Sequence, residues 1–102
     1  MNSLIEDKRF EIERICRLRH VRQMDVFGSA ARGDFDHERS DLDFLVTFEP
    51  LNPGQHADAY FGLLEDLEAL FGRPVDLVVA RAIKNPYFRQ AVESNKTLVY
   101  AA

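Results

Sequence analysis

The stretch from Phe27 to Phe48, FGSAARGDFDHERSDLDFLVTF, constrains this chain more than any other part of its sequence. A Gly-Ser pair opens a segment of small residues at Gly28, and a polar loop follows. Asp41-Leu42-Asp43 then begins an apolar run that predicts a buried strand. Since side chains alternate across a strand, we expect Asp41 and Asp43 on one face and Leu42 on the other.

Two carboxylates on one face need a partner that cancels their charge. At a separation of about 4–5 Å they repel by about 3–4 kcal/mol at an effective dielectric of about 20. Either a shared proton or a cation with hard oxygen ligands, typically Mg²⁺, relieves this repulsion. The Gly28-Ser29 turn is a natural complement, because glycine admits a ligand close to the backbone and a helix start attracts phosphate. Divalent metal beside phosphate is the chemistry of nucleotide transfer.

Several parts of this stretch resemble the signature of minimal nucleotidyltransferases, a group within the DNA polymerase beta superfamily. The resemblance implies a third carboxylate on a later strand, and it covers most of the chain. The chain departs from many members by one extra residue, since eleven residues separate Ser29 from Asp41, and the extra residue falls in the polar Phe35–Arg39 loop. The matching residues are Gly28-Ser29, Ala30-Ala31-Arg32-Gly33-Asp34, Ser40-Asp41-Leu42-Asp43, and, for the third acid, Asp76 in Pro74-Val75-Asp76-Leu77-Val78-Val79.

The resemblance also implies roles for these residues. Asp41 and Asp43 would hold two Mg²⁺ ions, and Asp76 would complete the second metal site and help to deprotonate the attacking hydroxyl. Ser29 and the backbone amides of Gly28-Ser29 would hold the β- and γ-phosphates of ATP. Arg32 is suited either to a phosphate or to a nearby carboxylate such as Asp34, and both alternatives stay open.

The small members of this family are antitoxins that are encoded with a HEPN ribonuclease toxin and add AMP to one of its tyrosines. The resemblance therefore implies a protein adenylyltransferase that forms a hetero-oligomer with such a toxin. A binding module that neutralises its partner by covering it is the alternative. An antibiotic nucleotidyltransferase uses the same motif but needs a second domain for its small acceptor.

The three acids also have a simpler interpretation. Asp41, Asp43 and Asp76 could be solvated residues at strand ends or helix caps, because a short D-x-D motif recurs freely. The Gly-Ser turn before the pair and the third acid after it favour the metal site.

Composition narrows the class of protein. A length of 102 residues predicts one domain over residues 1–102, and 46% apolar with 11% aromatic residues indicates a globular chain. A net charge of −4 argues against direct nucleic-acid binding, and Cys16 as the one cysteine fits a reducing compartment. Charges at residues 6–9 interrupt any leader, and no apolar run approaches membrane-spanning length. We expect a soluble cytoplasmic protein without membrane contact.

Periodicity predicts the α/β class. The helix 55–71, stopped by Gly72, connects the Asp41 strand to the next one, so these strands should be parallel. We expect a mixed sheet of three or four strands, with helices mainly on one face and the acids on the other. The remaining elements are a helix from a Ser3/Glu6 capping box to about Leu18, strands Met24–Phe27, Val75–Ala80 and Thr97–Tyr100 (the last at an edge), and a helix from the Asn85-Pro86 cap to near Asn95.

Outside the motif, ordinary structural roles are favoured. Cys16 lies on the apolar stripe of the first helix, which favours packing over a reactive thiol. The histidines are not spaced like zinc ligands. A run of basic residues near the end of the first helix is interpreted as a solvated face, and a contact with a partner or nucleotide is the alternative. It comprises Arg14, Arg17, Arg19 and Arg22.

Overall fold

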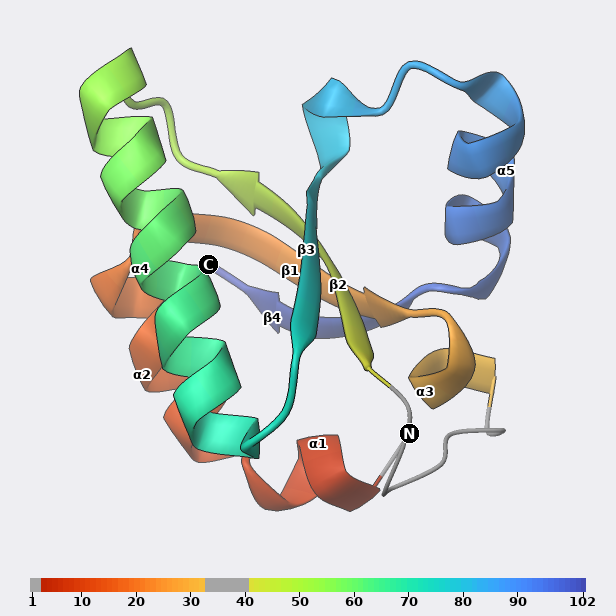
Figure 1. The fold of residues 1–102 in the computed structure, drawn as a ribbon, viewed down its shortest axis with the longest axis horizontal. Coiled ribbons are helices and arrows are strands. Elements are labelled where there is room, and N and C mark those ends of the chain that lie inside the picture. The colour runs from red at the N-terminus through yellow and green to blue at the C-terminus, as the bar shows by residue number, and fades with distance from the viewer. Residues whose placement is uncertain (1–2, 33–40) are drawn as a thin grey trace.

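The computed structural model describes residues 3–32 and 41–102, which form a four-stranded sheet with helices on both faces (Figure 1). The polar loop that the sequence places at 35–39 lies outside the described residues. Side chains are described for residues 3–31 and 41–102. In chain order the elements are α1 (Ser3–Asp7), α2 (Arg9–Leu18), β1 (Val21–Phe27), α3 (Ser29–Arg32), β2 (Leu42–Phe48), α4 (Pro53–Phe71), β3 (Val75–Val79), the 3₁₀ turn η1 (Ala80–Ala82), α5 (Pro86–Asn95) and β4 (Thr97–Ala101).

The strand order is β3-β2-β1-β4, so β4 lies at an edge of the sheet as expected. β1 runs antiparallel to β2 and to β4, whereas β2 and β3 are parallel. The connection between the parallel strands is α4, because parallel neighbours need a crossover and a helix supplies it. The predicted α/β class, the mixed sheet and the parallel pair are therefore confirmed.

One face of the sheet packs against α1, α2 and α4 and forms the larger core. Alternate residues of β2 point into it, and α4 contributes the apolar face that its spacing predicts. In Figure 1, α2 and α4 lie together on the side of the sheet opposite α5. The fully buried large side chains of this core include Ile5, Ile12, Met24, Leu42, Phe44, Val46, Leu63 and Leu67.

Helix α4 begins and ends at capping residues. Asn52 and Gln55 form a reciprocal capping box, in which the Gln55 amide donates to Asn52 Oδ1 at 2.8 Å and the Asn52 amide to Gln55 Oε1 at 3.2 Å. Pro53 follows the cap, so the helix starts two residues before the predicted residue 55. Gly72 ends the helix in the left-handed conformation at φ 63°, as predicted.

The N-terminal helix differs from the prediction. The continuous helix expected up to Leu18 is broken at Lys8 into α1 and α2, and Ile5 and Ile12 both lie in the larger core. Ser3 is already helical, and the Glu6 carboxylate accepts a hydrogen bond from Arg9 at 2.8 Å instead of closing a capping box. An ion pair thus replaces the predicted cap at this end of the chain.

The opposite face of the sheet is covered in part by α5. Val92 of α5 packs on Phe27 and Leu45 in a second, smaller cluster. Asn85 caps this helix as predicted, accepting hydrogen bonds from the amides of Tyr87 and Phe88. The rest of this face carries the acidic residues, as expected, because its strand positions alternate with those that fill the larger core.

Two further findings concern the strands and the helices. β1 is longer than predicted, since it begins at Val21, which is buried and pairs with Phe48 of β2. The strand propensity of residues 21–23 alone does not predict this extension, which depends on pairing with β2. Among the helices that the structure describes, none combines the length and the apolarity that crossing a bilayer requires.

Candidate active site

Asp43 and Asp76 lie side by side on neighbouring strands. They are register partners in the parallel pair of β2 and β3. The residues that flank Asp43, Leu42 and Phe44, are fully buried in the larger core, so Asp43 points to the opposite face. Asp76 faces the same side, because its own flanking residues on β3 are also buried in that core. The Asp43 side chain is half-buried and that of Asp76 is exposed.

Asp41 directly precedes β2 and is exposed. Leu42 between the two acids is completely buried, so it points away from their face as predicted. The Leu42 amide donates to the carbonyl of Pro74 at 3.3 Å, which holds this end of β2 beside the start of β3. Asp41 therefore lies two residues from Asp43 at the same end of the strand.

The donor set fits Mg²⁺ together with a phosphate ligand. Within residues 3–31 and 41–102, no three Asp, Glu, His or Cys side chains converge closely enough to hold a metal by themselves. Mg²⁺ does not require such a cage, because it usually binds one or two carboxylates and completes its octahedron with water and substrate phosphates. Asp43 and Asp76, which are register partners, could supply such carboxylates, and Asp41 is two residues from Asp43.

Gly28 brings the backbone directly against Asp43. It follows Phe27, the antiparallel register partner of Asp43, and has φ 71°, a conformation that side chains disfavour. A Cβ atom at Gly28 would overlap Oδ2 of Asp43 and lie 3.2 Å from its Cγ. Glycine is therefore required at this position both by its conformation and by the close approach.

Ser29 begins the short helix α3, which contacts both β1 and β2. The Ala31 amide donates to the carbonyl of Gly28 at 3.1 Å, and Ala30 is buried beneath the turn. Ser29 is half-buried beside this turn. The side chain of Arg32, like Asp34, lies outside the described part of the chain, so its phosphate and carboxylate alternatives stay open.

Sequence reasoning assigned no role to Asp25, a buried carboxylate on the acidic face that is only 2% exposed. Lys96, at the junction of α5 and β4, lies 3.4 Å from Asp25 Oδ2, and Gln23 donates to Oδ1 at 3.3 Å. The pKa of Lys96 is raised, first by its hydrogen bond to Glu93 and then by the charge of Asp25. The only sign of this buried carboxylate in the sequence was an acidic residue between two apolar residues of a predicted strand.

The ordinary interpretation of Cys16 agrees with the structure. The side chain is fully buried, and this burial raises the pKa of the thiol to about 12.

Of the basic run, Arg19 pairs with Asp66 of α4 at 2.8 Å, whereas Arg14 and Arg17 are exposed on α2. Arg14 and Arg17 thus lie on the solvent-exposed side of α2, and Arg19 forms an ion pair.

The mixed sheet, with Asp43 and Asp76 paired beside a glycine turn and a short helix, agrees with the nucleotidyltransferase class. The nucleotidyltransferase domain family matches residues 11–99, so the chain belongs to this family and is a nucleotidyltransferase enzyme. A Methanocaldococcus jannaschii protein provisionally named a protein adenylyltransferase is 38% identical over 80 residues, 78% of this chain and 76% of that protein. The protein adenylyltransferase MntA of Thermococcus cleftensis is 43% identical over 65 residues, 64% of this chain and 62% of that protein.

Solved structures agree with this fold. A chain provisionally described as a minimal nucleotidyltransferase is 33% identical and superimposes with a TM-score of 0.76, covering 95% of both chains. A chain from the complex of a tri-AMPylated Shewanella oneidensis HEPN toxin with an MNT antitoxin has a TM-score of 0.65 at 19% identity, over 96% of this chain and 73% of that one. The second likeness concerns the fold alone.

Proposed function

We propose that this chain transfers AMP from ATP to a hydroxyl group of another protein, with Mg²⁺ as the metal. The observation that carries this proposal is the pairing of Asp43 with Asp76 beside the backbone of Gly28. Carboxylates on neighbouring strands next to a glycine turn suit a metal-bound triphosphate. The similarity to relatives named protein adenylyltransferases supports a protein as the acceptor.

In this proposal Asp41, Asp43 and Asp76 hold Mg²⁺, and two ions would be bound. The metal supplies charge neutralisation at the entering and leaving oxygens. Asp76 also accepts the proton of the attacking hydroxyl, whose oxygen forms a bond to the α-phosphorus while pyrophosphate leaves. The amides of Gly28-Ser29 and the Ser29 hydroxyl orient the β- and γ-phosphates, and of the two alternatives for Arg32 we propose the contact with a phosphate.

The acceptor that we propose is a tyrosine of a HEPN-type toxin, so that the chain acts as an antitoxin within a hetero-oligomer. Support comes from solved chains of the same fold, which include an MNT antitoxin complex with a tri-AMPylated HEPN toxin and a toxin–antitoxin complex with AMP-PNP. A tyrosine hydroxyl on an exposed segment can enter the metal site without unfolding its own domain. We further propose that the reaction takes place in the cytoplasm, where ATP and magnesium are available.

Mass spectrometry tests the transfer directly. Purified partner is incubated with a substoichiometric amount of this protein, ATP and Mg²⁺. We expect a gain of about 329 Da or a multiple of it, the mass of AMP that remains when pyrophosphate leaves. The partner's toxicity should be lost and should stay lost after this protein is removed. An unmodified partner under these conditions would contradict the proposal.

The same assay separates the enzyme from the binding module. A double variant, Asp41→Asn with Asp43→Asn, removes two acids that do not contribute to the hydrophobic core, so it should fold normally. If the chain acts as an enzyme, this variant should add no mass to the partner and should not neutralise it. The binding module would be identified by two results together. The double variant would neutralise the partner at stoichiometric amounts, and the wild type would add no mass to the partner.

A further inference from the structure

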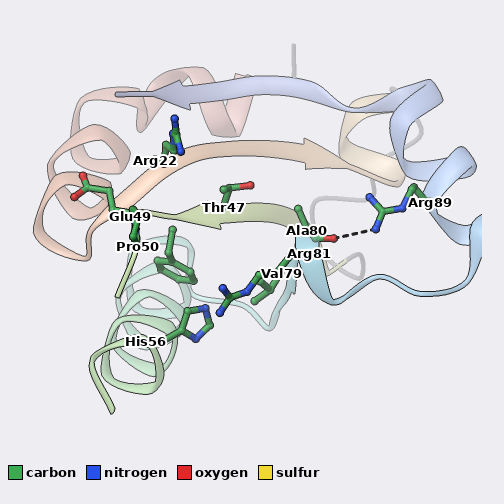
Figure 2. A pocket seen from close by; sticks show the side chains of 10 residues that line it. Arg22, Thr47, Glu49, Pro50, His56, Val79, Ala80, Arg81 and Arg89 are labelled. Carbon is green, nitrogen blue, oxygen red and sulfur yellow. Dashed lines mark hydrogen bonds between the residues drawn. The ribbon is translucent and has the colours of Figure 1, made fainter. Parts of the chain in front are cut away.

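A pocket lies at the end of the sheet far from the paired aspartates. It has a volume of about 460 Å³ and lies where β2 and β3 end, between α4 and α5 (Figure 2). Thr47 on its wall is four residues beyond Asp43 on β2, roughly 13 Å at about 3.3 Å per residue. The distance is too long for one phosphate to contact both places, so a phosphate bound in the pocket is distinct from one held beside Asp43.

Positive charge is concentrated in this pocket. Arg22 of β1, Arg81 of η1 and Arg89 of α5 line it together with a single acidic residue, Glu49. Figure 2 shows Arg81 extending from η1 toward His56 of α4. Guanidinium groups that line one cavity favour the binding of an anion there, because the anion offsets their positive charge. Since the whole chain has a net charge of −4, this excess of positive charge is local.

The three arginines are held in different ways. Arg89 donates to the carbonyls of Ile83 at 2.6 Å and Ala80 at 3.5 Å, so its guanidinium is oriented at the pocket wall. In the described part of the chain, no side-chain hydrogen bond or salt bridge occupies Arg22 or Arg81. Two guanidinium groups thus retain all their donors, which suits bidentate binding of a phosphate.

The remaining walls suit the rest of a nucleotide. Phe48 and His56 meet edge to face with their ring centroids 5.0 Å apart, and Val79 and Pro50 add apolar surface. A planar base can pack against such a wall and against a guanidinium plane. Thr47 offers a hydroxyl to the polar edge of the ligand. The volume also falls within the range of small-ligand sites.

We propose that this pocket is a second nucleotide site, which binds the phosphate of a nucleoside monophosphate through Arg22 and Arg81 and its base against His56 and Phe48. The choice of AMP as the nucleotide rests on the proposed function, which uses ATP and attaches AMP. Two sources present the same chemistry, free AMP and an AMP group already attached to the acceptor protein. In either case the site lies on the enzyme but outside the reacting centre.

Nuclear magnetic resonance tests the site without any catalytic turnover. Isotope-labelled Asp43→Asn protein in EDTA, with its metal site disabled, is titrated with AMP, inorganic phosphate and adenosine. We expect the amide signals of Thr47, Ala80 and Arg81 to shift with AMP, more weakly with phosphate and least with adenosine. The absence of shifts at these amides with millimolar AMP would overturn the proposal.

Substitutions test which side chains bind. Arg22→Gln and Arg81→Gln should each weaken AMP binding by about tenfold or more, the loss expected when a charged phosphate contact is removed. Lys84→Gln is the matched control, because Lys84 is an exposed cation close in sequence to Arg81 that does not line the pocket. Both arginines are exposed, so the variants should keep the wild-type spectrum. Equal affinities in all three variants would overturn the assignment of the arginines.

A second arm identifies the source of the nucleotide. A synthetic peptide that carries tyrosine-linked AMP is compared with free AMP and with the unmodified peptide. Tighter binding of the modified peptide at the same amides supports an acceptor-linked group, and binding of free AMP alone supports a free nucleotide. Failure of both ligands to shift these signals excludes the site. Because no transfer is measured, binding here with no mass gain on a partner would refute the proposed function and leave the pocket assignment standing.

Discussion

The backbone of Gly28 lies against the carboxylate of Asp43 so closely that a Cβ atom would overlap Oδ2. This contact joins the turn before α3 to the strand that carries the paired aspartates. It follows from the antiparallel register, in which Phe27 is opposite Asp43. The turn that is proposed to hold phosphates and one of the acids that are proposed to hold the metal are therefore packed together as one unit.

Gly28→Ala should disrupt this unit. The left-handed φ of 71° would cost about 1–2 kcal/mol for alanine, and the methyl group would displace the Asp43 carboxylate. We expect a lower melting temperature and a loss of most AMP transfer. Gly54→Ala is the control, since a Cβ there has only Asn52 Oδ1 nearby, at 3.7 Å, and alanine favours the helix. Wild-type transfer by Gly28→Ala would contradict the assigned role of the turn.

Asp76 and Ser29 should differ in their effects on nucleotide binding. Asp76→Asn should remove most of the transfer rate and leave much of the ATP affinity, because its proposed role is at the attacking hydroxyl. Ser29→Ala should weaken ATP binding and also slow the reaction. Calorimetry with ATP and Mg²⁺, together with single-turnover transfer, separates the two variants. The same loss of ATP affinity in both would argue against this division.

Stability should fall at high pH because of Cys16. Burial raises the pKa of this thiol from 9.0 to about 12, so the unfolded chain loses the proton at a lower pH than the folded protein does. The contribution to stability is complete below pH 9 and declines as pH rises toward 12, by at most about 1.4 kcal/mol per unit. Urea unfolding at pH values on either side of 9 measures the slope. Cys16→Ala should lower stability at all pH values and lose this part of the slope.

Lys96→Met should destabilise the fold by leaving the buried carboxylate of Asp25 without its cation. We expect a loss of about 1–3 kcal/mol in the free energy of unfolding, measured by denaturant, because a buried charge without a partner is costly. Lys84→Met, at an exposed cation, should change stability by less than about 0.5 kcal/mol. Adding Asp25→Asn to Lys96→Met should recover part of the loss. Additive losses in that double variant would mean that the two side chains are not coupled.

The sequence alone determined the features that depend on short-range geometry. Alternation along a strand placed Leu42 inside and Asp43 outside, and the spacing of apolar residues placed the buried face of α4. The end of that helix at Gly72 and the cap at Asn85 were also predictable. These features follow from the fixed periods of helices and strands and from the conformations that single residues prefer, so neighbouring residues suffice.

Only the tertiary structure decided which distant residues meet. The register that sets Asp43 beside Asp76, the contact of Gly28 with Asp43, and the pairing of Asp25 with Lys96 all join separate elements. The break at Lys8 and the cationic pocket likewise depend on how helices pack on the sheet. Such pairings are selected by burial and hydrogen bonding summed over the whole core, and no local pattern in the chain contains that sum.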